Sequence, residues 1–179
     1  EEGYGLNPIA IHQLHQEGVQ LIITVDCGIT AVAEAELCRE LGIDLVITDH
    51  HECKDTLPYA AAVVDPHRSD CPYPFKELAG VGVVFKLLCA MESVLHPELP
   101  MTACVLRVSK AYGDLVAIGT VADVMPIRDE NRLIVSYGLQ LMEKSPRPGL
   151  IELLEATQTE SRATAKKKIT ATLIGYTVA

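Results

Sequence analysis

The length, composition and charge of the chain exclude several classes of protein. Its 179 residues are 49% hydrophobic, which is enough for one buried core or for one domain and the beginning of a second. No run reaches the roughly 18 apolar residues of a membrane span, and the first residues do not resemble a targeting peptide, so we expect a cytoplasmic protein. The net charge of −9 argues against a general nucleic-acid coat, but acidic residues grouped around cations are compatible with a nucleic-acid enzyme.

Strands alternate with helices in the first part of the chain. Asn7 and Pro8 are typical of a helix start, and Thr30 can cap a second helix. Gly18 and Gly42 are typical of the residues that end such helices. In chain order we expect a helix over 8–17, a strand over 20–25, a helix over 31–41, and strands over 43–48 and 61–64. A strand–helix–strand unit of this kind is a right-handed crossover, so the sequence predicts an α/β fold with a parallel sheet and flanking helices.

The second half of the chain has a helical pattern. We expect helices over 80–94, 97–112, 114–123, 129–144 and 148–156, and another from about residue 162 onward. Because strand-like runs cease near Pro126, we expect an α/β catalytic domain over 1–126 and a helical connector over 127–179. The chain does not begin with Met and ends within an apolar stretch, so we also expect it to be a fragment of a longer protein.

Charged side chains follow two of the predicted strands at the point where each strand ends. Asp49, His50 and His51 follow one strand, and Asp26 follows the strand before it. The carboxyl ends of parallel strands are where open α/β sheets bind their ligands, which disfavours the alternative of a histidine-rich surface loop. Neighbouring side chains on an extended chain point in opposite directions, so His50 could bind a metal ion while His51 faces a substrate and donates a hydrogen bond or a proton. Asp49 could orient one of the two imidazoles.

Two further acids are candidates for the same site. Asp26 at the end of a buried strand needs a cation, a hydrogen bond or a helix to cap, and its two oxygens could bridge two metal ions. Asp123 ends an apolar helix, where its charge has the wrong sign for the helix dipole. It therefore needs a positive partner, which could be a bound metal ion or, alternatively, Arg128 or Arg132.

An imidazole with two or more carboxylates forms a hard nitrogen and oxygen site. Such ligands suit Mn²⁺ or Mg²⁺ more than structural zinc, and the six cysteines, which form no C-x-x-C pair, add no evident thiolate ligand. A site of this kind would activate water and neutralise charge on a phosphoryl group. Gly80 and Gly82 open a predicted helix whose backbone amides could bind a phosphate, although glycine at such positions more often permits close packing.

Five segments of the chain resemble one known family. They are LIITVDCGIT, VITDHHE, VVDPHR, CPYPFKELAGVGVVFKL and IGTVADVMPIRDENR. These segments are similar to successive segments of the RecJ-type single-strand exonucleases, which belong to the DHH phosphoesterase superfamily. The DHH triplet is typical of the superfamily as a whole, whereas YPFKELAGVG and GTVADVMP resemble the RecJ type in particular.

The resemblance implies a two-metal exonuclease acting in DNA repair and recombination. By this resemblance Asp26 bridges the metal ions, and His50 and Asp123 bind the second of them. His51 would contact the scissile phosphate. Members of the family hydrolyse single-stranded DNA from the 5′ end with Mn²⁺ or Mg²⁺ and release mononucleotides. The first motif of the family, an aspartate pair, would lie upstream of Glu1, so we expect at most one well-formed metal site and low activity from this chain.

Two other functions fit the same residues. A DHH-family phosphatase, or a phosphodiesterase for oligonucleotides or cyclic dinucleotides, would share the metal chemistry but act on small substrates. A non-catalytic DHH domain could instead act as a scaffold in replication or repair. All four candidate catalytic residues are present in the sequence, which favours an enzyme over a scaffold.

Overall fold

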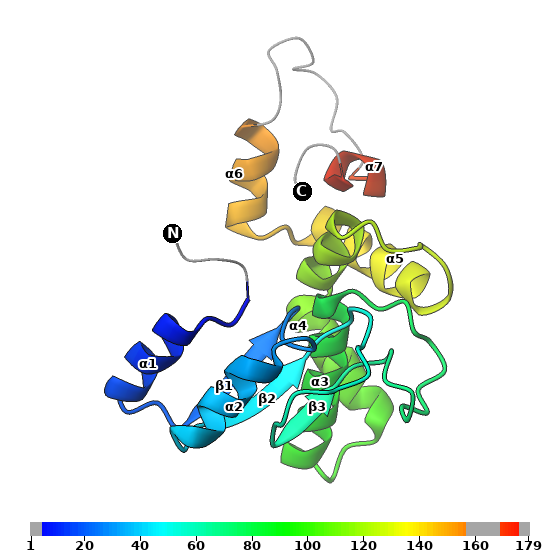
Figure 1. Cartoon of the computed structure of the whole chain (residues 1–179). Coiled ribbons are helices and arrows are strands. Elements are labelled where there is room, and N and C mark those ends of the chain that lie inside the picture. Colours follow the sequence, from blue (N-terminus) through cyan, green and yellow to red (C-terminus); the bar gives the residue numbers. More distant parts are fainter. Residues whose placement is uncertain (1–4, 157–168, 176–179) are drawn as a thin grey trace. The chain divides into compact units, whose positions relative to one another are not determined.

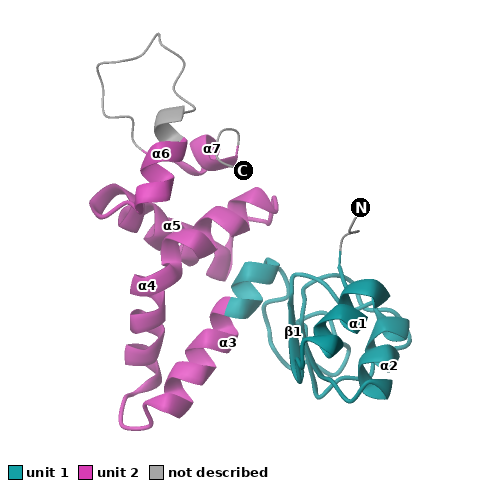
Figure 2. Cartoon of the chain, turned by 90° about the vertical axis from the view of Figure 1, so that its left-hand side faces the viewer, with its two compact units in different colours: residues 1–84 teal, residues 85–179 magenta. Residues whose placement is uncertain are grey.

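The computed structural model describes residues 5–156 and 169–175, and the chain divides into two compact units, residues 1–84 and 85–179 (Figure 2). The predicted division into a catalytic domain over 1–126 and a connector over 127–179 separates the chain by function. The two compact units do not test that separation, so it stays a prediction. Within the described ranges, none of the helices combines the length and apolar character that crossing a membrane requires. The six cysteines all lie in these ranges, and none of them forms a disulfide.

The first unit is a three-stranded parallel sheet with two helices. Its elements are α1 (Pro8–Gln16), β1 (Leu21–Val25), α2 (Val32–Glu40), β2 (Asp44–Thr48) and β3 (Ala62–Val64) (Figure 1). The strands lie in the order β1-β2-β3, and both pairings are parallel. The predicted α/β class and parallel sheet are confirmed, and each element ends within one residue of the prediction.

Local side-chain and backbone chemistry sets most of the helix ends in this unit. The Asn7 side chain caps α1 by accepting a hydrogen bond of 2.8 Å from the backbone amide of Ala10. Gly18 and Gly42 follow α1 and α2 with φ angles of 82° and 71°. A left-handed backbone of this kind carries no steric penalty for glycine, so both helices end where the sequence predicted.

The start of α2 differs from the prediction. The helix begins at Val32 after Ala31, and no side chain accepts a hydrogen bond at its cap, so the prediction that Thr30 caps α2 is wrong. The loop before the helix is held instead by Asp49, whose carboxylate accepts a hydrogen bond of 2.9 Å from the backbone amide of Ile29. A partner 20 residues away in the sequence has replaced the local cap.

One face of the sheet is buried against the two helices. The core of this unit contains Ile11 from α1, two residues of α2 and three residues from β2 and its start, namely Ala35, Cys38, Ile43, Leu45 and Ile47. On the other face of β1, Leu21, Ile23 and Val25 are each about half exposed. A slip of β2 by one residue would turn its core side chains outward, so burial sets the register of the strands.

The second unit is helical. Its elements are the remainder of α3 (Gly80–Leu95), α4 (Met101–Ala122), α5 (Asp129–Lys144), α6 (Pro148–Ala156) and the short α7 (Ala171–Leu173). The helix that we expected from residue 162 falls largely on residues 157–168, which lie outside the described ranges. Within the described part, α7 follows a cap in which the Thr170 side chain accepts a hydrogen bond of 3.1 Å from the amide of Leu173.

A single helix, α4, replaces the two helices predicted over 97–112 and 114–123. The expected break at Gly113 does not occur, because this glycine is buried where α4 packs on α5. A Cβ atom at Gly113 would lie 3.2 Å from the side chains of Leu141 and Tyr137. Glycine therefore permits a close helix contact here and does not end the helix.

The backbones of α4 and α5 approach each other closely at Gly138. A Cβ atom at this position would lie 2.3 Å from Cβ of Ala117 and 2.5 Å from the carbonyl oxygen of Gly113. We predict that Gly138→Ala destabilises the chain by about 1–3 kcal/mol, because the two helices must separate to admit one methyl group. The measurement is a urea titration followed by circular dichroism.

The matched control is Gly149→Ala in α6, where a Cβ atom would meet nothing within 4 Å. This substitution should leave stability unchanged or raise it by up to about 1 kcal/mol, since alanine favours helix. Equal unfolding midpoints for the two variants would contradict the close crossing of α4 and α5.

Candidate metal centre

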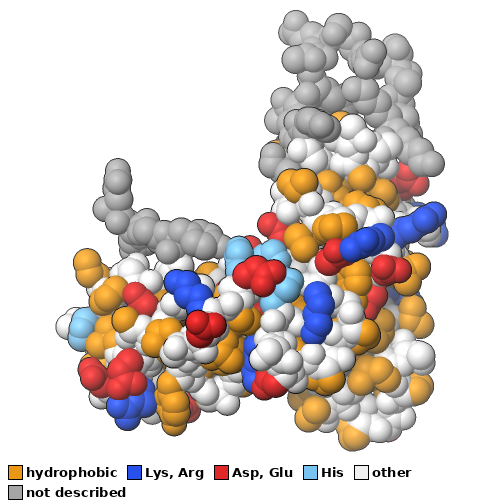
Figure 3. All heavy atoms as spheres, turned by 45° about the vertical axis from the view of Figure 1, so that its right-hand side comes forward, with side chains coloured by type: hydrophobic (Ala, Val, Ile, Leu, Met, Phe, Trp, Pro, Cys, Tyr) orange, Lys and Arg blue, Asp and Glu red, His pale blue; other side chains and the backbone are white. Residues whose placement is uncertain are grey.

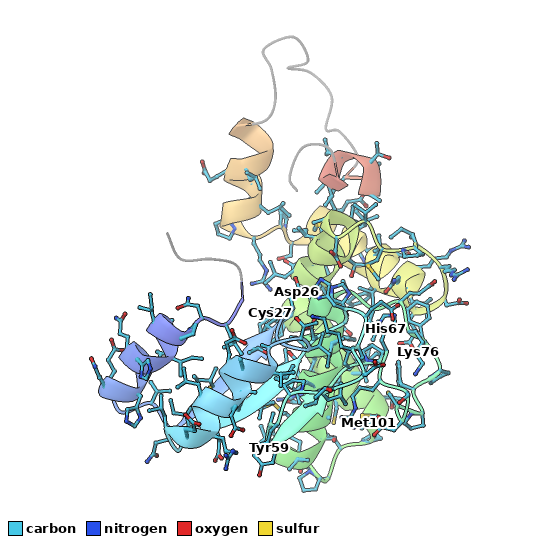
Figure 4. The ribbon with its side chains drawn as sticks, viewed as in Figure 1. Asp26, Cys27, Tyr59, His67, Lys76 and Met101 are labelled. Carbon is cyan, nitrogen blue, oxygen red and sulfur yellow. The ribbon has the colours of Figure 1, made fainter. Side chains whose placement is uncertain are left out.

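The parallel register brings the ends of the three strands together at one edge of the sheet. Val25 pairs with Thr48 at the ends of β1 and β2, and Thr48 pairs with Val64 at the end of β3. The residues that follow continue the pairing, because the amide of Asp26 donates to the carbonyl of Thr48 and the amide of Asp49 donates to the carbonyl of Val64, both at 3.0 Å. Figure 4 shows Asp26 with Cys27 at this edge.

Four predicted site residues meet at the edge. One ligand atom each from Asp26, Asp49, His50 and His51 lies within 4.8 Å of all the others. In the described part of the chain, these four side chains form a group whose spacing could hold a metal ion. The structure therefore brings these four predicted residues together, and their role in one site stays a prediction.

Asp26 and His50 have the geometry of two ligands of one ion. The Nε2 atom of His50 lies 2.9 Å from the Oδ1 atom of Asp26. Two ligands at right angles around an ion, each about 2.1 Å from it, are about 3.0 Å apart. The His50 side chain is 7% exposed and that of Asp26 is 47% exposed, so the pair is anchored inside the protein and can still be reached from solvent. These two residues fit an octahedral divalent cation.

Asp49 belongs to the group but acts through its neighbours. Its Oδ2 atom accepts the amide of Ile29 at 2.9 Å, and its Oδ1 atom accepts the amides of His50 and His51 at 2.8 and 3.3 Å. The Nδ1 atom of His51 also lies 2.7 Å from Oδ1. Because the carboxylate is 1% exposed and both oxygens are used in this way, Asp49 positions the loop and the imidazole and is a poor candidate for a metal ligand.

The protonation of Asp49 follows from this network. Burial by itself would raise the pKa of the Asp49 carboxyl, but hydrogen bonds outweigh it and lower the pKa below its usual range. The donors are the backbone amide of Ile29, the His51 imidazole and the backbone amides of the two histidines. Asp49 therefore stays ionised and holds its donors firmly.

The side chains of His50 and His51 differ in exposure, but their rings are in contact and do not point in opposite directions as the sequence predicted. The two rings are tilted by 55° with centroids 4.5 Å apart, and the His51 side chain is 51% exposed whereas that of His50 is 7% exposed. Because Nδ1 of His51 is turned toward Asp49, its Nε2 lies on the far side of the ring. On the face drawn in Figure 3, histidine side chains lie beside acidic ones. One imidazole is thus buried beside Asp26, and the other is half exposed to solvent.

Asp65 at the end of β3 is a residue that the sequence analysis did not assign to the site. It is 2% exposed, and its Oδ1 atom accepts the amide of His67 at 2.8 Å. Burial raises the pKa of the Asp65 carboxyl, and the negative charge of Asp49 raises it further. The strand-end rule that identified Asp26 and Asp49 applies equally to Asp65, so the signal was present in the sequence.

Asp123 and the two glycines are placed differently from one another. Asp123 caps the end of α4 in the second unit, so its predicted role as a ligand stays a prediction. Gly80 begins α3, and a Cβ atom there would lie 2.3 Å from Oδ1 of Asp26, whereas a Cβ atom at Gly82 would meet only Leu78, at 3.2 Å. Both glycines are in close contacts, which favours packing over phosphate binding.

Comparison with known proteins identifies similar chains. Residues 4–120 match the DHH family, N-terminal domain. The chain is 48% identical over 155 residues to the single-stranded-DNA-specific exonuclease RecJ of Bacillus subtilis, covering 87% of this chain and 18% of that protein. It is 41% identical over 175 residues to the Escherichia coli protein of the same name, covering 92% and 29%. The chain therefore spans less than a third of the length of these curated relatives.

Two solved structures are also similar. A crystal structure of exonuclease RecJ bound to manganese superimposes with a TM-score of 0.76 and 35% identity, covering 99% of this chain and 41% of that one. The crystal structure of RecJ from Thermus thermophilus in complex with Mn²⁺ has a TM-score of 0.72 and 34% identity, covering 96% and 24%.

The hydrogen bonds of Asp49 predict how stability depends on pH. Asp49→Asn should destabilise the chain by about 1–3 kcal/mol at pH 7, because the amide nitrogen cannot accept the hydrogen bonds that one carboxylate oxygen accepts. The folded-state pKa is lowered, so the stability from the ionised carboxylate is present above about pH 4 and is lost as the pH falls through the folded-state pKa. Urea titrations of the wild type and of Asp49→Asn across this pH range measure the difference between their free energies of unfolding. This difference should become smaller as the pH falls.

Asp44→Asn provides the control, since Asp44 is an exposed carboxylate at the start of β2. A stability difference for Asp49→Asn that is the same at pH 7 and at the acid end, or no larger than that for Asp44→Asn, would rule out the assigned role of Asp49.

Proposed function

The chain belongs to the DHH family, and from this premise we propose that it is the metal-dependent catalytic core of an exonuclease that hydrolyses single-stranded DNA from the 5′ end. The observation that carries the proposal is the 2.9 Å spacing of His50 Nε2 and Asp26 Oδ1 at the carboxyl edge of the sheet. The similar curated proteins are single-stranded-DNA-specific exonucleases, which supports this substrate. We further propose a place in DNA repair and recombination.

Asp26 and His50 would hold Mn²⁺ or Mg²⁺. The two similar solved structures are bound to manganese, and the mixed carboxylate and imidazole ligands suit such an ion. When bound, a divalent ion supplies positive charge beside the phosphoryl group and makes water a better nucleophile. We propose Asp123 as a further ligand and Asp26 as the residue whose second oxygen reaches a second ion.

His51 would act on the substrate and Asp49 would hold it in place. The contact between Asp49 Oδ1 and His51 Nδ1, 2.7 Å long, fixes the direction of the ring. When the half-exposed ring is an imidazolium, Nδ1–H donates to Asp49 and Nε2–H would face the scissile phosphate, where it donates a hydrogen bond or gives its proton to the departing 3′ oxygen and leaves a neutral ring. A nucleoside 5′-phosphate and a shortened strand are the products.

Substitution of the two histidines separates metal binding from hydrolysis. We predict that His50→Ala weakens Mn²⁺ binding more than about 10-fold, since a ligand is lost, whereas His51→Ala binds Mn²⁺ as the wild type does. His51→Ala should lower hydrolysis by about 10²- to 10⁴-fold. Paramagnetic broadening of NMR signals by Mn²⁺ measures binding, and His12→Ala, an exposed histidine on α1, is the control.

Substrate length distinguishes the proposed exonuclease from its alternatives. With Mn²⁺ and a high concentration of the chain, slow release of mononucleotides from the 5′ end of long single strands is expected, with duplex DNA resistant. Activity confined to dinucleotides or cyclic dinucleotides would point to a small-substrate phosphodiesterase. Binding of Mn²⁺ and DNA with no hydrolysis of any substrate would point to a scaffold.

A further inference from the structure

Gly80 approaches Asp26 more closely than any other amino acid would allow. A Cβ atom at Gly80 would lie 2.3 Å from Oδ1 of Asp26 and 2.6 Å from its Cβ and Cγ atoms. Both residues belong to the first unit, and Gly80 is buried at the first position of α3. The carboxylate of Asp26 therefore occupies the space that a side chain at Gly80 would need.

The other surroundings of Asp26 also restrict its carboxylate. Its backbone has a φ angle of 63°, which is uncommon for a residue other than glycine and fixes the direction in which the side chain leaves the strand end. The Oδ1 atom is fully buried beside His50 Nε2, although the side chain as a whole is 47% exposed. The exposed surface therefore belongs to the rest of the side chain, so the two oxygens have different environments.

The start of α3 also suits a negative charge. The first turn of a 16-residue helix presents backbone amides with partial positive charge, and the Asp26 carboxylate lies against it. A carboxylate at this position is favoured by the helix dipole.

We propose that Gly80 is a positioning residue of the metal centre. Its lack of a side chain allows the first turn of α3 to pack on Asp26 and to hold Oδ1 of Asp26 beside Nε2 of His50. This inference rests on the proposed function, because it assigns Gly80 a role in the metal binding proposed for Asp26 and His50.

A methyl group at Gly80 has a definite consequence. Either the start of α3 or the carboxylate of Asp26 must move. Movement of the carboxylate changes its contact with Nε2 of His50, and movement of α3 removes the packing that holds the carboxylate there. Alanine favours helix by up to about 1 kcal/mol, so the helix itself gains from the change. The expected loss is therefore in the metal centre and not in the secondary structure.

Gly82 provides a matched control two residues further along the same helix. The three atoms nearest to a Cβ atom at Gly82 belong to the side chain of Leu78, at 3.2, 3.3 and 3.8 Å, so no polar atom lies closer than 3.8 Å. Gly82→Ala therefore has the same chemistry and nearly the same location as Gly80→Ala, but does not contact the carboxylate.

The experiment compares wild type, Gly80→Ala and Gly82→Ala in the 179-residue chain, with two readouts. Without metal, NMR signals of the His50 imidazole should shift in Gly80→Ala and stay unchanged in Gly82→Ala. With Mn²⁺, paramagnetic broadening should show binding weakened about 10- to 100-fold in Gly80→Ala and near wild type in Gly82→Ala. Circular dichroism should show the same helix content in all three proteins.

Wild-type Mn²⁺ binding and unshifted His50 signals in Gly80→Ala would overturn the inference. If the wild type binds no Mn²⁺, the proposed function fails, whereas the metal-free His50 signals still test the contact. If Gly80→Ala unfolds the chain, the comparison is made in an Asp26→Gly background, which removes the atoms that the methyl group meets. If Gly80→Ala folds in the Asp26→Gly background, the result supports the close approach of Gly80 to Asp26. If Gly80→Ala unfolds the chain both with Asp26 and with Gly at position 26, the result contradicts that approach.

Discussion

The parallel register of β1 and β2 is the constraint on which the metal centre depends. Because Val25 lies opposite Thr48, the next residues of both strands leave the sheet side by side, and Asp26 meets His50. Burial of Leu45 and Ile47 on one face sets this register, since a shift by one residue would turn both side chains out of the core. The hydrophobic core of the first unit therefore determines the geometry of a polar site at its edge.

Polar groups at that edge are stabilised by one another. Asp49 carries a buried negative charge and accepts three backbone amides and an imidazole, so its desolvation is offset by hydrogen bonds. Asp26 has a strained backbone and lies against the start of α3, where the helix dipole favours a carboxylate. Asp49 thus holds the loop and the His51 imidazole, whereas Asp26 points its carboxylate at the His50 imidazole. A metal centre benefits from this separation of roles, because side chains that their neighbours already hold in place lose little conformational entropy when they bind a metal ion.

Predictions from the sequence succeeded where a feature depended on neighbouring residues. Asn7 caps α1, Gly18 and Gly42 end their helices, and the strands lie where apolar runs end in charged residues. The predictions failed where a distant partner decided the outcome. Thr30 does not cap α2, and the loop before this helix is held by Asp49 from another strand end. Gly113 does not break α4, since it is the contact with α5 that requires a glycine there.

The sequence by itself determined the α/β class, the parallel strands and the strand ends at which Asp26, His50 and His51 lie, because hydrophobic periodicity is a local property of the chain. Only the tertiary structure decided which groups each acid contacts. Asp49 acts as a positioning residue because three backbone amides surround it, and Gly80 matters because the start of a helix lies against Asp26. Contacts between residues far apart in the sequence depend on how whole elements pack, which no local pattern records.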